Sequence, residues 1–174
     1  MPAPQSRRLK PGSAMRAIAK AKTKPESAKE RYARYIEQVQ EVVEHDATLP
    51  AVQKFAVTAV AKPRMTQSDS WNKRDAVLRY RAYGDEMRLL GAKLPYAYHV
   101  EFILPMPDSW PEEVKQAMDG AIHLLKPDTS NLCKAIEDVL VAKDEVIHNI
   151  SATKHWGRTP LITIRKAQRR VGED

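Results

Sequence analysis

The chain has 174 residues and a formal net charge of +7 at pH 7, with 43% hydrophobic and 29% charged residues. This size and composition suit one globular domain with an appendage. No apolar run approaches the ~18 residues of a membrane-spanning helix, so we expect no membrane association. The single cysteine, Cys133, excludes an internal disulfide and a cysteine-rich metal site, and we expect it to be a small core residue.

Residues 1–25 are strongly basic and contain no acidic residue. Pro and Ala are frequent there, so we expect a disordered or weakly helical cationic arm. A secretory signal is not expected, because no apolar segment accompanies the basic residues. Such an arm can attract a phosphate backbone in a salt-sensitive way. A solubilising tail without a binding role is the alternative.

A helix is predicted over residues 25–45. Ser27 and Glu30 have the spacing of a capping box, and apolar residues recur at helical intervals through the segment. We expect this apolar stripe to be buried on the main domain or on a partner subunit. The segment DATLP that follows has the composition of a linker.

The linker divides the chain into a basic, partly disordered arm with an amphipathic helix at 1–50 and a main domain at 51–174. Strands are predicted at 53–62, 96–104, 145–154 and 160–166, and helices at 74–90, at 111–120 and within the stretch 126–140. A turn is expected around Trp156 and Gly157. This order indicates an α/β (α+β) domain in which helices pack on a mixed β-sheet.

The stretch KPDTSNLCKAIEDVL, residues 126–140, gathers polar side chains on one side of a predicted helix. Its apolar residues form a stripe that we expect to be buried, while Asn131, Lys134 and Asp138 lie on a neighbouring face. Asp128 stands just before the first turn. Helix capping and a solvated ion pair would produce the same pattern. The spacing alone therefore does not distinguish this structural role from a functional site.

Several common catalytic motifs are absent from the sequence. There is no glycine-rich phosphate loop, no HExxH pair and no GxSxG elbow, and the histidines are not spaced as zinc ligands. The remaining candidates for catalysis are carboxylates, a lysine on a predicted helix and many other basic residues. Phosphodiester hydrolysis needs an activated water and a positive charge against the phosphate, and carboxylate-bound Mg²⁺ supplies both. Asp128 and Asp144 could converge at one sheet edge for this purpose, with Lys134 reaching towards the phosphate.

The segment KPDTSNLCKAIEDVLVAKDEVIHNISATKHWG resembles the signature of the RusA-type endodeoxyribonucleases, the Holliday junction resolvases of phages and prophages. The shared features are a KPDxDN-like stretch, a lysine one turn later, a further acidic residue in the helix, a DD-containing turn and a basic-aromatic-Gly strand end. The resemblance covers residues 53–167. It implies a RusA-like fold and a cytoplasmic enzyme of DNA recombination and repair, in a bacterial host or phage-infected cell.

The resemblance also implies roles for individual residues. Asp128 and Asp144 match the catalytic carboxylates that bind Mg²⁺ or Mn²⁺, and Lys134 matches the catalytic lysine. Asn131 matches the motif asparagine and Asp138 the helical acidic residue, so both are expected to support the metal site or to substitute for a ligand.

Ser130 departs from the family pattern, because it stands where the motif usually has its second aspartate. Its hydroxyl can hydrogen-bond a metal-bound water but supplies no negative charge. Lys143 occupies the first position of the DD pair. Either another carboxylate substitutes for the lost aspartate, with Glu101, Glu137 and Glu145 as candidates, or metal affinity and rate have fallen.

Basic residues outside the catalytic set are candidate DNA contacts: Lys62, Arg64, Lys126, Lys154 and Arg158. A solvated basic surface is the alternative interpretation. The three tryptophans, Trp71, Trp110 and Trp156, could stack on unpaired bases, although packing in the core is the favoured prediction.

We therefore predict a metal-dependent endodeoxyribonuclease that resolves four-way DNA junctions by paired symmetric cleavage. The resemblance implies a homodimer, which suits the reaction because a two-fold dimer presents two equal sites. One alternative is a junction- or DNA-binding protein on a RusA-like scaffold, with weak or absent nuclease activity because of Ser130. Another is a regulator or packaging factor that uses the basic arm on duplex DNA.

Overall fold

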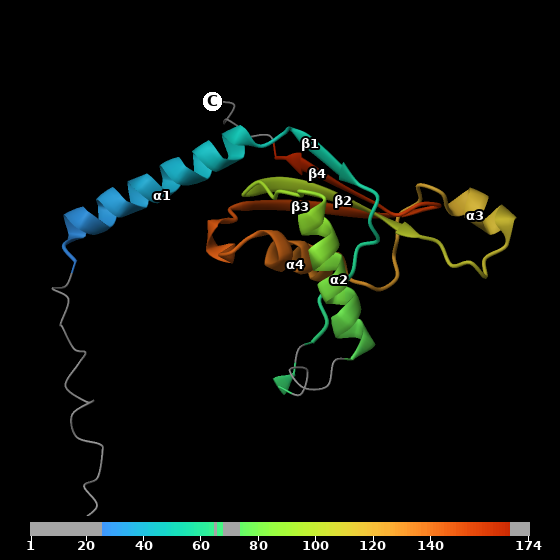
Figure 1. Cartoon of the computed structure of the whole chain (residues 1–174). Helices are drawn as coiled ribbons and strands as arrows, with labels where there is room; N and C mark the ends of the chain where they lie inside the picture. Colours follow the sequence, from blue (N-terminus) through green and yellow to red (C-terminus); the bar gives the residue numbers. More distant parts are fainter. Residues whose placement is uncertain (1–25, 65, 68–73, 168–174) are drawn as a thin grey trace, which may run out of the picture. The chain divides into compact units, whose positions relative to one another are not determined.

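The computed structural model describes residues 26–64, 66–67 and 74–167 (Figure 1). The basic arm and Trp71 lie outside these described residues. The chain divides into two units, residues 1–37 and 38–174. No helix in the described ranges is both long and apolar enough to cross a membrane.

The first unit holds the beginning of helix α1 (Ala28–Thr48). The backbone N–H of Ser27 donates to Glu30 Oε2 at 2.7 Å, and that of Glu30 donates to Ser27 Oγ at 3.3 Å, so the predicted capping box is present. Hydrogen bonding to the Glu30 carboxyl, first from the Ser27 backbone N–H and then from the Ser27 side chain, lowers the pKa of Glu30. Tyr32 and Tyr35 are exposed in the described structure, so burial of the apolar stripe stays a prediction.

The second unit is built on a four-stranded sheet with the order β1-β4-β2-β3. Its strands are β1 (Val52–Phe55), β2 (Ala97–Pro105), β3 (Asn149–Gly157) and β4 (Leu161–Lys166). β2 pairs with β3 in parallel, whereas β4 is antiparallel to both β1 and β2. The sheet is therefore mixed and the fold is α+β, as the sequence predicted.

Three helices connect these strands: α2 (Asp75–Leu89), α3 (Glu112–Met118) and α4 (Thr129–Leu140). Alternate residues of β2, from Tyr98 to Leu104, are buried in one core with apolar side chains of α2 and α4. These two helices thus cover the same face of the sheet (Figure 1). Cys133 of α4 is buried in this core, which confirms its predicted place.

Two predicted strands are longer in the sequence pattern than in the structure. The strand predicted at 53–62 ends at Phe55, because β4 offers partners only from Ile162 to Arg165. The strand predicted from residue 145 begins at Asn149, where the partner strand β2 also begins. Residues without a partner strand have no ladder to join.

The segment around the expected turn also differs from the prediction. Trp156 and Gly157 belong to β3 and pair with Leu104 and Pro105, so the turn falls after them. Asp144, expected at a strand start, instead lies in a short 3₁₀ turn, η2 (Asp144–Val146), in which the Ile147 N–H donates to the Asp144 carbonyl. This turn holds the Asp144 side chain near α4.

Candidate functional site

Lys134 of α4 is the centre of a cluster of charged side chains. Its Nζ donates to Asp144 Oδ2 at 2.7 Å. The same nitrogen lies 3.6 Å from Asp138 Oδ1 and 3.9 Å from Glu137 Oε2. Asp138 and Glu137 follow Lys134 by one helical turn, which places all three on adjoining sides of α4. One ammonium group therefore faces three carboxylates.

Lys134 and Asp144 hold each other in their charged forms. The Lys134 hydrogen bond, followed by the Lys134 charge, lowers the pKa of Asp144. The same hydrogen bond raises the pKa of Lys134. Both side chains remain in contact with water, so the pair is a fixed arrangement of charges that a ligand can reach.

A second lysine enters the cluster from the segment that follows β1. Lys62 forms an ion pair with Asp138 Oδ2, and its charge also lowers the pKa of Asp144. The sequence predicted Lys62 as a candidate DNA contact and did not predict this ion pair. No local pattern could have shown it, because Lys62 and Asp138 are far apart in the sequence.

The floor of the cluster is a buried pair of polar side chains, Tyr98 and Glu137. The Tyr98 hydroxyl donates to Glu137 Oε1 at 2.7 Å, and both residues are buried. Burial, followed by this hydrogen bond, raises the pKa of Tyr98. The pair fixes one side of α4 against β2. Tyr98 was not predicted from the sequence, because in the sequence it has the pattern of an ordinary strand residue.

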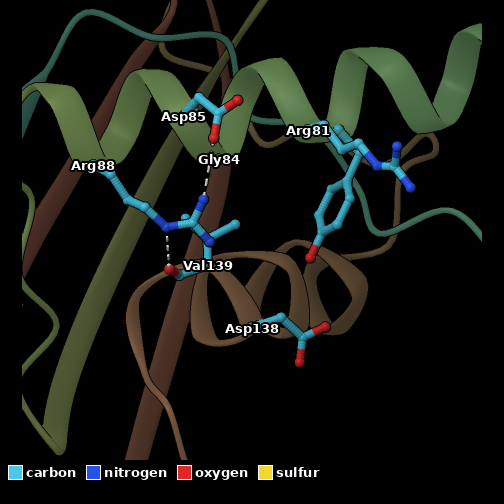
Figure 2. A pocket seen from close by; sticks show the side chains of 7 residues that line it. Arg81, Gly84, Asp85, Arg88, Asp138 and Val139 are labelled. Atoms are coloured by element: carbon cyan, nitrogen blue, oxygen red, sulfur yellow. Dashed lines mark hydrogen bonds and ion pairs between the residues drawn. The ribbon is translucent and has the colours of Figure 1, made fainter.

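A surface pocket of about 240 Å³ lies beside Asp138, between α2 and α4 (Figure 2). On one side, Arg88 reaches across from α2 and donates to the Val139 carbonyl at 3.2 Å (Figure 2). Tyr80 also lines the pocket, and its pKa is raised by burial and then by the charge of Asp138. Arg81 and Asp85 also line the pocket, which reaches the charged cluster through Asp138.

Asp128 occupies the position before the first turn of α4, as predicted, but its side chain makes no capping hydrogen bond. It is exposed, as is Ser130, and no ion pair joins it to another residue of the described ranges. The loop before it is held by Lys154, whose Nζ donates to the carbonyls of Leu125 at 2.6 Å and Pro127 at 2.7 Å. Lys154, predicted to contact DNA, thus has an internal role.

The other predicted DNA contacts divide into two groups. Lys126 and Arg64 are exposed. Arg158 donates to Glu112 Oε1 at 2.5 Å and lies 3.9 Å from Asp119, so its charge is partly neutralised within the chain. The roles assigned to all of these residues stay predictions.

The candidate substitutes for the missing motif aspartate lie in different places. Glu101 is on the sheet face opposite α4, because it alternates with the buried residues of β2, and it contacts Arg165 at 3.5 Å. It is therefore not available to the site. Glu137 is near Lys134 but is engaged by Tyr98, and Glu145 is exposed in η2.

The donor chemistry of this cluster suits a hard divalent cation, which prefers carboxylate oxygens. Within the described part of the chain, however, no three His, Cys, Asp or Glu side chains meet closely enough to form a metal-binding group. A lysine ammonium lies among the carboxylates instead. Asp128 and Asp144 remain the predicted ligands.

Two tryptophans pack as expected. The Trp110 and Trp156 rings lie 4.9 Å apart between centroids, and Trp156 is buried. Packing is thus the role that the structure shows for this pair.

Comparison with known proteins finds a family match for part of the chain. Residues 86–165 match the model of the family described as Endodeoxyribonuclease RusA. No curated protein and no solved structure matches the chain. The matched region contains β2, α3, α4, η2, β3 and all but the last residue of β4, and it includes Lys134, Asp138 and Asp144. The chain therefore carries a domain of the RusA endodeoxyribonuclease family, whose general class is a nuclease of the Holliday junction resolvase type.

Proposed function

We propose that this protein is a metal-dependent endodeoxyribonuclease that resolves four-way DNA junctions by paired symmetric cleavage. The observation that carries the proposal is the 2.7 Å contact between Lys134 and Asp144 inside a RusA family domain. A carboxylate and a cation held together at a solvent-facing surface suit attack on a phosphodiester.

In this proposal Lys134 has two tasks. Its charge offsets the negative charge that develops on the phosphate, and its hydrogen bond orients the Asp144 carboxylate. Lys62 supplies a second positive charge through its contact with Asp138. Asp128 and Asp144 would hold Mg²⁺ or Mn²⁺, which when bound supplies a polarised water and neutralises phosphate charge.

The proposed homodimer, which the family resemblance implies, suits the reaction. Resolving a four-way junction takes two symmetric nicks, and a two-fold dimer presents one site to each scissile strand. The exposed Lys126 and Arg64, together with the basic residues of the arm, would attract the DNA backbone.

A junction-binding protein with weak or absent nuclease activity is the second candidate. The observation that favours it is the exposed serine at position 130, together with the absence of a three-ligand metal group among the described residues. A serine adds no charge to a site that already contains the Lys134 ammonium.

Cleavage of a labelled four-way junction in Mg²⁺ or Mn²⁺ separates these candidates, with wild type, Asp128→Asn and Ser130→Asp compared. Paired nicks by wild type that disappear in Asp128→Asn support the nuclease. Binding without cleavage by wild type, with cleavage gained in Ser130→Asp, supports the binding protein. If none of the three cuts or binds a junction, the proposed function is wrong.

A further inference from the structure

Three apolar side chains project into solvent just ahead of Asp128. Ile122 is 66% exposed, Leu124 85% and Leu125 60%. Aliphatic side chains of this size favour burial by roughly 1.5–3 kcal/mol each, so adjacent exposed ones mark a contact surface more often than isolated ones do. We call residues 122–125 the apolar segment.

The backbone of the apolar segment is fixed along one side of β3. Ile122 forms a β-bridge with His155, and the His123 N–H donates to the Lys154 carbonyl at 3.0 Å. The His123 side chain is only 4% exposed, with its ring 3.7 Å from that of Trp156. Inward residues thus alternate with outward ones, which turns Ile122 and Leu124 away from the core.

Lys154 fixes the end of the same segment. Its two hydrogen bonds to the Leu125 and Pro127 carbonyls hold the chain between the leucines and Asp128. The backbone that carries Leu124 and Leu125 is therefore held in place. These leucines lie only a few residues before Asp128, the proposed catalytic carboxylate.

A second copy of this chain does not suit the apolar segment as its main partner. Specific protein interfaces bury roughly 800 Å² per partner, which three aliphatic side chains on one loop cannot supply. The next residue, Lys126, is exposed and positively charged. A short apolar tip followed by a cation matches DNA, in which an apolar base step lies beside a phosphate.

We propose that Leu124 and Leu125 form a wedge that enters an opened base step at the branch point of a DNA junction, while Lys126 contacts the neighbouring phosphate. Leucine and isoleucine are among the side chains that proteins insert between base steps, and the unstacking is cheapest where stacking is already interrupted. This inference rests on the proposed function and adds to it a basis for preferring branched over continuous duplex DNA.

The test uses the full chain and a four-way junction that carries 2-aminopurine next to the crossover, because this base fluoresces more strongly when it is unstacked. Wild type is expected to raise the fluorescence of the bound junction, and Leu124→Ser/Leu125→Ser to abolish that rise. Affinity for continuous duplex DNA is expected to stay within twofold of wild type. Leu89→Ser/Leu90→Ser is the matched control, since these adjacent leucines at the end of α2 are also exposed.

Several outcomes of this experiment would overturn the wedge proposal or the proposed nuclease activity. An unchanged fluorescence rise in the wedge variant, or an equal loss in the control variant, would overturn the proposal. So would a halving of the mass of the wedge variant in light scattering, because the segment would then join two copies. A wild type that unstacks the branch point but does not cut would refute the proposed nuclease and leave the wedge standing. A wild type that binds no junction would refute both.

Discussion

At the scale of single residues, Lys134 determines the character of the site. Its ammonium group contacts Asp144 and lies within 4 Å of two more carboxylates. The positive charge therefore offsets the repulsion among these carboxylates, which would otherwise disfavour their ionised forms. Any substitution at this position changes both the charge offered to a phosphate and the placement of Asp144.

Lys134→Met is expected to lower the single-turnover cleavage rate of a four-way junction by roughly 10²–10³-fold, because a charge aimed at the transition state is lost. Junction affinity should change far less. Lys93→Met, an exposed lysine outside the cluster, is the control and should cleave like wild type. A Lys134→Met rate within a few-fold of wild type would show that this lysine only stabilises α4.

Tyr98→Phe tests the buried floor of the site. The substitution leaves the Glu137 carboxylate without its donor in a buried place, which should lower the free energy of unfolding by about 1–3 kcal/mol in urea denaturation. Tyr98→Phe combined with Glu137→Gln should recover part of that loss, because an amide is cheaper to bury than a charge. Failure of the double variant to recover any stability would contradict this account.

The thiol of Cys133 should be nearly inert in the folded protein. Burial, followed by the charge of Glu137, raises the pKa of Cys133 to about 11. At pH 8 the group is therefore almost wholly the protonated thiol, and its thiolate grows only as the pH rises towards 11. Iodoacetamide labelling followed by mass spectrometry should be slow at pH 8 and fast in denaturant, whereas rapid labelling of native protein would show an open core.

At the scale of elements, the sequence predicted the helices and strands whose bounds depend on local hydrophobic patterns. It did not predict strand bounds that depend on a partner strand. The sequence predicted β2, α2 and α4 well, because hydrophobic periodicity is a local property and these elements bury one face each. It predicted β1 too long and β3 too early, because the length of a strand depends on where its neighbour ends. That information lies in β4 and β2, far along the chain.

The same distinction holds for the candidate site. Asn131, Lys134 and Asp138 were predicted to share one side of a helix from their spacing, and the helix is present. The ion pair of Lys62 and the hydrogen bond of Tyr98 could not be predicted, because each joins distant segments through the packing of the sheet on α4. The metal-binding roles of Asp128 and Asp144 stay predictions.

The end of α2 offers a test of one element boundary. Gly91 has φ +70°, and the N–H groups of Gly91 and Ala92 donate to the carbonyls of Arg88 and Met87 in a Schellman arrangement. Gly91→Ala should cost roughly 1 kcal/mol of unfolding free energy, since a β-carbon disfavours this backbone region. Thermal denaturation should show a smaller loss for Gly91→Asn, and equal losses would refute the conformational explanation.

At the scale of the whole molecule, positive charge is unevenly distributed along the chain. Residues 1–25 carry as many positive charges as the entire net charge of +7. Without them the remainder is close to neutral, so the general attraction of the protein for DNA should depend largely on the arm.

Removal of residues 1–25 should therefore weaken DNA binding and flatten its dependence on salt. Fluorescence anisotropy across a series of NaCl concentrations should give a shallower slope of log affinity against log salt for the shortened chain, on duplex and junction alike. The preference for junction over duplex should persist, because the wedge and the charged cluster remain. An unchanged slope would identify the arm as a solubilising tail.

The parallel pairing of β2 with β3 has a consequence for how the site is assembled during folding. Both α3 and α4 belong to the connection between these two strands, so the strands meet only after the whole stretch from Pro105 to Asn149 has closed. Closing a long connection is slow relative to local helix formation. Helix α4 should thus form early while Asp144 is still distant from Lys134, and pulse-labelled hydrogen exchange should find β3 among the last segments to gain protection.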